Sequence, residues 1–136
     1  MRIVTIECTS SATDILAALD GRETSSAELL ELYLSRIERL AKTANAVVTL
    51  DAERARAEAR RCDTERARGE LRGRLHGLPV TVKDSFETEG VRTTSGGTPE
   101  LMSHVPAADA VVVARLKRAG AIVFGKTNLS TLAMDI

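Results

Sequence analysis

The sequence has few aromatic residues and no excess of charge of either sign. Tyr33, Phe86 and Phe124 are its three aromatic side chains, and it contains no tryptophan. Proteins that bind single-stranded nucleic acids stack the bases on aromatic rings. Proteins that bind nucleic acids or anionic membranes usually carry a basic patch on their surface. Here 19 basic residues balance 19 acidic residues. We therefore expect neither a nucleic acid nor a membrane as a partner.

Cysteine is also scarce, and long apolar runs are missing. Cys8 and Cys62 form no C-x-x-C pair and no metal-ligand spacing, so we expect reduced thiols in an intracellular protein. No apolar stretch approaches the roughly 20 residues of a membrane span. Residues 1–7 contain no apolar run of the kind found in a signal peptide. These absences predict a cytoplasmic location.

Histidine is limited to His76 and His104, which fall in separate predicted loops. No acid or cysteine accompanies either of them at the spacing of a metal-binding motif. We therefore expect no metal site and no cofactor.

The first part of the chain, residues 1–74, is expected to be mainly helical. Two serines are each followed three positions later by an acid, which resembles a capping box: Ser11 with Asp14, and Ser25 with Glu28. Gly21 fits the end of the first helix. After the second cap, apolar residues at helical spacing predict a helix over roughly residues 26–41. These residues are Leu29, Leu30, Tyr33, Leu34, Ile37 and Leu40.

A β-branched run over residues 45–50 then predicts a short strand. Residues 51–68 mix alanine, arginine and glutamate, and they predict a charged helix. Its i,i+4 pairs, Arg54–Glu58 and Arg61–Glu65, are each worth about 0.2–0.5 kcal/mol. We expect the charged face of this helix to be solvated.

The second part alternates strands and helices, which predicts an α/β fold. A turn at His76-Gly77 leads into a short buried strand that begins at Pro79, and a loop follows over residues 91–102. Pro106 and Asp109 are expected to begin the next helix, with Gly120 at its end. The core-facing residues of that helix are expected to be Val112, Val113 and Leu116.

The final residues are predicted to form a buried strand at Ala121–Phe124 and a further helix from Asn128. Residues 120–127 also fit the pattern G-x-x-x-x-G-K-T of a phosphate-binding loop, which presents backbone N–H groups between a strand and a helix. Here the four middle residues are apolar and β-prone, and a helix precedes Gly120. We therefore predict that this segment is a strand and does not bind nucleotide.

Lys83 stands at the end of the predicted strand that begins at Pro79, near a glycine-rich loop over residues 93–97. Open α/β sheets usually keep their chemistry at the carboxyl ends of strands. A lysine amine acts as a base only when it is neutral, and burial favours the neutral form. Lys83 is therefore a candidate general base whose pKa burial would lower. The alternative is a strand-end cation that pairs with Asp84.

Several blocks of the sequence resemble the amidase signature family in their order and spacing. They are Leu75–Asp84, Thr93–Gly96, Asp109–Ala121 and Gly125–Asn128, and Asn45–Asp51 resembles the segment that leads into them. The resemblance covers roughly residues 25–130. It implies the N-terminal part of a mixed β-sheet flanked by helices. We expect a single partial domain over residues 1–136, with a helical layer over 1–74 and the truncated first part of the α/β core over 75–136.

The resemblance also implies a reaction. Members of this family hydrolyse carbon–nitrogen amide bonds with a serine nucleophile, a bridging serine on a cis peptide bond and a lysine base, and Lys83 falls on that lysine. The two serines belong to a later glycine- and serine-rich segment, so Lys83 is the one member of the triad expected in this chain. The implied partner is a small-molecule amide, which would bind once the later segment completes the site.

A second hypothesis is a non-catalytic chain, either truncated or partner-binding. An incomplete sheet leaves an unpaired edge and uncovered apolar surface, and both favour association. We therefore expect self-association or a partner chain at that edge. The blocks do not specify an amide substrate, because family members with different substrates share them.

Overall fold

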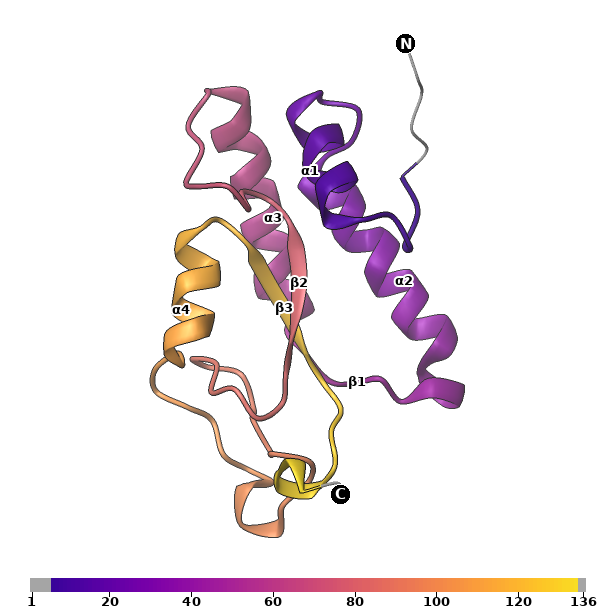
Figure 1. Cartoon of the computed structure of the whole chain (residues 1–136), viewed down its shortest axis with the longest axis vertical. Helices are drawn as coiled ribbons and strands as arrows, with labels where there is room; N and C mark the ends of the chain where they lie inside the picture. The colour runs from indigo at the N-terminus through magenta and orange to yellow at the C-terminus, as the bar shows by residue number, and fades with distance from the viewer. Residues whose placement is uncertain (1–5, 135–136) are drawn as a thin grey trace.

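The computed structural model describes residues 6–134 as a mixed α/β structure (Figure 1). Its elements follow the order α1 (Ala12–Asp20), α2 (Ser26–Ala44), β1 (Val47–Leu50), α3 (Ala52–Ala67), β2 (Pro79–Lys83), α4 (Val111–Arg118) and β3 (Ile122–Thr127). Short 3-10 turns lie at Pro99–Leu101 and Thr131–Ala133. The predicted fold class is confirmed. No helix within the described residues is long and apolar enough to cross a bilayer.

Strand β3 is the centre of a mixed sheet with the order β1–β3–β2. It runs antiparallel to β1 and parallel to β2. Val82 lies opposite Lys126, and Lys83 lies opposite Thr127. Because β2 and β3 are parallel, their carboxyl ends reach the same end of the molecule, where the long loop before α4 also lies (Figure 1).

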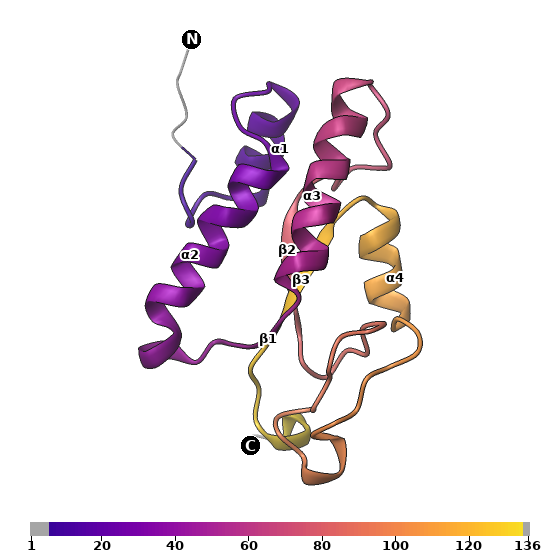
Figure 2. The same cartoon turned by 180° about the vertical axis from the view of Figure 1, so that it is seen from behind.

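Helices cover both faces of the sheet because alternate residues of β3 point to opposite sides. Ile122 and Phe124 pack with α2 and α3, whereas Val123 packs with Val82 and with Val113 of α4. Figures 1 and 2 show α3 over one face of the β2–β3 pair, with α2 beside α3. A further apolar cluster joins α1, α2 and the residue before β2: Ile15, Leu19, Leu29 and Leu78.

Both predicted N-terminal caps are present, at Ser11 for α1 and at Ser25 for α2. In the second, the Glu28 carboxylate accepts the Ser25 N–H at 2.8 Å and completes a capping box. Asp63 of α3 also accepts the first two N–H groups of α2, at 2.7 and 3.1 Å. A carboxylate at this position complements the positive end of the helix dipole. The packing of α3 therefore fixes where α2 begins.

The predicted start of α4 is wrong. Asp109 does not cap the helix, because its carboxylate accepts the Glu89 N–H at 2.8 Å and pairs with Lys117 Nζ at 2.8 Å. The helix begins after it, without a side-chain cap. In the resulting orientation Val113 is fully buried, but Val112 is 43% exposed and does not face the core as predicted.

The helix predicted from Asn128 is not formed within the described residues. The Asn128 N–H donates to the Ala46 carbonyl oxygen at 2.9 Å, which continues the pairing of β1 with β3. The short turn at Thr131–Ala133 follows, and Leu132 has a φ of 53° there. Residues 135–136, where the predicted helix would continue, lie outside the described residues.

The turn before β2 packs tightly against two helices. The Leu75 N–H donates to the Ala119 carbonyl oxygen at 2.8 Å, and the Gly77 N–H donates to the Gly120 carbonyl oxygen at 2.9 Å. Gly77 has a φ of +81°, and a side chain there would collide with the Ser26 hydroxyl. Both the backbone conformation and the lack of space therefore require glycine.

Replacing Gly77 by alanine should destabilise the fold more than the same change at Gly69. The two glycines have similar φ values, +81° and +77°, but a Cβ at Gly69 would meet nothing within 4 Å. The shared backbone strain costs about 1–2 kcal/mol, and the collision with Ser26 adds about 1–3 kcal/mol at Gly77 alone. Chemical denaturation measures both variants. Equal losses of unfolding free energy would contradict the close packing of this turn on α2.

Candidate functional site

Lys83 ends β2 and leads into a tight turn. Its carbonyl oxygen accepts the Phe86 N–H at 2.9 Å. Side chains alternate along the strand, so Lys83 points away from the face on which Val82 is buried under α4. The position at the strand end is as predicted. Lys83 is exposed in the described part of the chain.

Asp84 is the buried acid at this strand end. Its side chain is fully buried, and Oδ2 accepts both the N–H and the hydroxyl of Thr94, at 2.9 and 2.6 Å. The other oxygen, Oδ1, lies 3.6 Å from Lys126 Nζ. The alternative interpretation, an ion pair between Lys83 and Asp84, is therefore wrong. Within residues 6–134, the cation that pairs with Asp84 is Lys126.

Lys126 extends from β3 to the turn that follows Lys83. It is fully buried, and its ammonium donates to the Phe86 carbonyl oxygen at 2.6 Å and to the Thr93 hydroxyl at 2.7 Å. Burial lowers the pKa of Lys126, and the nearby Asp84 carboxylate opposes that shift. Oxygen acceptors on several sides are what allow a charge to be buried.

Sequence reasoning missed Lys126 as a site residue. The only signal was a lysine close behind the apolar run Ala121–Phe124, in the segment that fits a phosphate-binding loop. Ile122–Phe124 of that run lie in the buried strand β3, as predicted. Lys126 continues the strand, and its ammonium is engaged by oxygen atoms of the protein.

The glycine-rich loop over residues 93–97 folds against Asp84. The Ser95 N–H donates to the Asp84 carbonyl oxygen at 3.2 Å. Three successive residues of the loop have positive φ, of 53°, 83° and 77°. A side chain at Gly96 would come within 2.5 Å of the Ser130 carbonyl oxygen, so the loop is packed on its far side as well. The predicted nearness of this loop to the end of β2 is confirmed.

A hollow of about 200 Å³ opens beside this loop. Its lining includes Asp84, Arg92, Thr94, Gly96 and Asn128. Ligand pockets usually measure about 300–1,000 Å³, so the hollow is small for a substrate. Lys83 is not among its lining residues.

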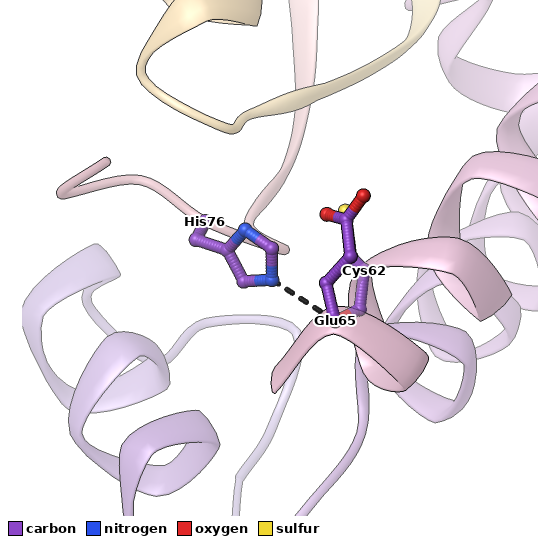
Figure 3. A group of neighbouring side chains, drawn as sticks. All are labelled: Cys62, Glu65 and His76. Atoms are coloured by element: carbon purple, nitrogen blue, oxygen red, sulfur yellow. Dashed lines mark hydrogen bonds between the residues drawn. The ribbon is translucent and has the colours of Figure 1, made fainter. Parts of the chain in front are cut away.

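A second polar group lies before the amino end of β2. Cys62 and Glu65 of α3 meet His76 there (Figure 3), and their ligand atoms all lie within 4.8 Å of one another. The prediction that no cluster of acids or cysteines joins a histidine at metal-ligand spacing is therefore wrong for His76. The spacing of Cys62 and Glu65 places both on one side of a helix, and the fold brings the distant His76 to them.

The Cys62–Glu65–His76 group is already satisfied by protein partners. His76 Nδ1 accepts the Arg72 N–H at 3.3 Å, so Nε2 carries the proton and donates to the Cys62 carbonyl oxygen at 2.9 Å. The Arg72 guanidinium binds both oxygens of Glu65, at 2.6 and 2.9 Å, and lowers the pKa of that carboxyl. Burial raises the pKa of the Cys62 thiol to about 11. The Arg72 guanidinium supplies the positive charge at this group. The group has a structural role, because its hydrogen bonds attach the loop before β2 to α3.

Arg72 also changes the charged face of α3. The i,i+4 spacing predicted that Glu58 pairs with Arg54. Instead, Glu58 pairs with Arg72 of the following loop, and Arg54 pairs with Asp51. The other predicted pair, Arg61–Glu65, is present at 3.0 Å. The loop therefore covers part of a face that we expected to be solvated.

Replacing Lys126 by methionine should cost about 3–5 kcal/mol of unfolding free energy. Methionine keeps an unbranched stem but removes the ammonium, which leaves the Asp84 carboxylate buried without its cation. The matched control is Lys117→Met, which breaks a partly exposed pair with Asp109 and should cost less than about 1 kcal/mol. Urea denaturation followed by circular dichroism measures both variants. Equal losses would contradict the importance of the buried pair.

Cys62 should resist thiol reagents that label Cys8. Thiolates are the reactive species, and a thiol with a pKa of about 11 is protonated at pH 8. Mass spectrometry after brief iodoacetamide treatment should find Cys8 modified and Cys62 unmodified, with both modified in urea. Rapid labelling of Cys62 in the folded chain would contradict its burial. A rise in melting temperature with micromolar zinc would show instead that Cys62, Glu65 and His76 bind a metal ion in place of their protein partners.

Comparisons with known proteins agree on one family. The sequence profile of the Amidase family matches residues 28–136. The chain is 47% identical over 125 residues to a glutamyl-tRNA(Gln) amidotransferase subunit of Aromatoleum aromaticum, and the alignment covers 92% of this chain and 25% of that protein. The chain thus spans about a quarter of the length of this curated relative.

Solved structures show the same similarity. The native peptide amidase from Stenotrophomonas maltophilia is 38% identical, with a TM-score of 0.83 over 91% of this chain and 26% of that chain. A protein from a vestigial complex that reveals the origins of an s-triazine catabolic enzyme is also 38% identical, with a TM-score of 0.83 over 90% of this chain and 27% of that chain. The chain belongs to the amidase signature family.

Proposed function

We propose that the chain is the N-terminal part of an amidase that hydrolyses carbon–nitrogen amide bonds, with Lys83 as the general base. The observation that carries the proposal is the location of Lys83 in a chain of this family. It lies at the carboxyl end of a strand with a parallel neighbour, close to a packed glycine-rich loop. Active sites of α/β proteins are concentrated at such strand ends.

In this proposal, Lys83 acts in its neutral form within a Ser–cis-Ser–Lys triad. The amine accepts, through the bridging serine, the proton that the nucleophilic serine releases as it attacks the amide carbonyl carbon. The proton then passes to the leaving amine. The serines would come from a later segment, and that segment would also cover the exposed Lys83 side chain. Exclusion of water from a lysine amine favours its neutral form.

A second candidate function is a non-catalytic module that binds a partner chain or a second copy. It is favoured by exposed apolar side chains on α4 and on the loop before it: Met102, Val105, Val111 and Val112. The curated relative is itself named as one subunit of an amidotransferase. In this case Lys83 would have no serine on which to act.

Replacing Lys83 by arginine should abolish amide hydrolysis by the full-length protein. Arginine keeps the positive charge but does not give up its proton, so kcat should fall about 10²–10⁴-fold, as it does when a general base is lost. Hydrolysis of an aryl amide measures the effect, with Lys83→Ala expected to fail equally. Lys117→Arg is the control and should retain turnover. Near-normal turnover by Lys83→Arg would show that Lys83 is not the base.

The coding sequence after Ile136 distinguishes the two candidate functions. The amidase proposal predicts an in-frame glycine- and serine-rich segment there, whereas the non-catalytic proposal predicts none. Residues 1–136 alone should not hydrolyse an aryl amide, because they supply only the lysine of the triad. Turnover by residues 1–136 that survives Lys83→Ala would overturn the role of Lys83.

A further inference from the structure

We infer that the buried pair of Asp84 and Lys126, together with Thr94, positions the candidate base Lys83. The pair locks the turn that follows Lys83 and the glycine-rich loop onto the end of β3. The inference rests on the proposed function of Lys83. The side chains of Asp84, Thr94 and Lys126 are directed at one another and at the backbone. They are therefore positioning residues.

Strand β3 holds the turn after Lys83 at two points. The Asp84 N–H donates to the Thr127 carbonyl oxygen at 3.0 Å. The Lys126 ammonium donates to the Phe86 carbonyl oxygen at 2.6 Å. Two successive residues of β3 thus bind both ends of a turn that is itself closed by the hydrogen bond from Phe86 to Lys83.

The same two charged residues also hold the glycine-rich loop. Asp84 accepts the Thr94 N–H and hydroxyl through its carboxylate and the Ser95 N–H through its carbonyl oxygen. Lys126 reaches the loop as well, because its ammonium donates to the Thr93 hydroxyl at 2.7 Å. A substitution of either charged residue should therefore remove hydrogen bonds from both the turn and the loop.

The pair acts on Lys83 through the backbone of β2. Lys126 lies opposite Val82, and neighbouring side chains on paired strands share a face. Lys83 is the next residue along β2, so it points to the other face. The pair therefore fixes the backbone from one face of the sheet and leaves the Lys83 amine accessible on the other.

The buried charges themselves favour positioning over simple stability. Asp84 Oδ1 has no hydrogen-bond partner among the described residues and faces Lys126 at 3.6 Å. Apolar residues of similar volume are often as stabilising as a buried ion pair, or more so. What the ion pair adds is a fixed direction for each of its hydrogen bonds, which suits a site whose lysine must be held in place.

The test uses the double variant Asp84→Asn/Lys126→Met, which removes both charges and leaves neither one buried alone. Amide hydrogen exchange of the full chain, read by NMR, reports on the turn at Phe86 and on the loop at Ser95. We expect exchange at both amides to become at least tenfold faster, while the amides of α2 and α3 keep their parent rates. Unchanged exchange at Phe86 and Ser95 would overturn the inference.

The matched control is the double variant Glu31→Gln/Arg56→Met, which removes an ion pair of 2.6 Å between α2 and α3. It should leave exchange at Phe86 and Ser95 unchanged. If the first double variant does not fold, Thr94→Val serves in its place, because it deletes one hydroxyl from the network. Thr94→Ser restores that hydroxyl and should restore slow exchange. Equal behaviour of the valine and serine variants would also overturn the inference.

Kinetics of the full-length protein separate this inference from the proposed function. Misplacement of the base should lower kcat at least tenfold in the Asp84→Asn/Lys126→Met variant and leave KM nearly unchanged. If hydrolysis requires Lys83 but this variant keeps its kcat, the positioning role is wrong. If Lys83→Arg is fully active, the proposed function is wrong, and the exchange measurements still decide whether the pair holds the turn and the loop.

Discussion

The ion pair between Asp84 and Lys126 is the interaction on which the candidate site depends. Both side chains are fully buried, and each buried ion carries a desolvation cost of several kcal/mol. Hydrogen bonds from the Thr94 N–H and hydroxyl, and bonds to the Phe86 carbonyl oxygen and the Thr93 hydroxyl, offset that cost. These partners come from the turn after β2 and from the glycine-rich loop. The pair of Asp84, at the end of β2, and Lys126, on β3, therefore holds two loop segments at a common point.

The strand that carries Lys83 is fixed before and after its five residues. Before it, His76 bonds to the Cys62 carbonyl oxygen, and Arg72 binds Glu65. After it, Asp84 and Lys126 hold the turn and the loop. Between these points, helices pack on both faces of the sheet. The end of β2 that carries the exposed Lys83 is thus held from both sides, as the proposed role of Lys83 requires.

Local signals predicted much of this fold, because they depend on residues a few positions apart. The caps at Ser11 and Ser25, the apolar stripe of α2 and the buried run of β3 are all of this kind. The position of Lys83 at a strand end could be predicted for the same reason. The contacts around this strand end could not be predicted from local signals. They are made by Lys126, whose hydrogen-bond acceptors Thr93 and Phe86 lie 33 and 40 residues away along the chain. Asp109 was misassigned as a helix cap because its partner Glu89 lies 20 residues away.

A double-mutant cycle on Asp84 and Lys126 tests the central claim most directly. It requires the unfolding free energies of the parent chain, Asp84→Asn, Lys126→Met and the double variant. If the two residues form one buried unit, the losses in the single variants should together exceed the loss in the double variant by about 1–3 kcal/mol. Losses that add to within about 0.5 kcal/mol would contradict the account, because independent sites behave in that way.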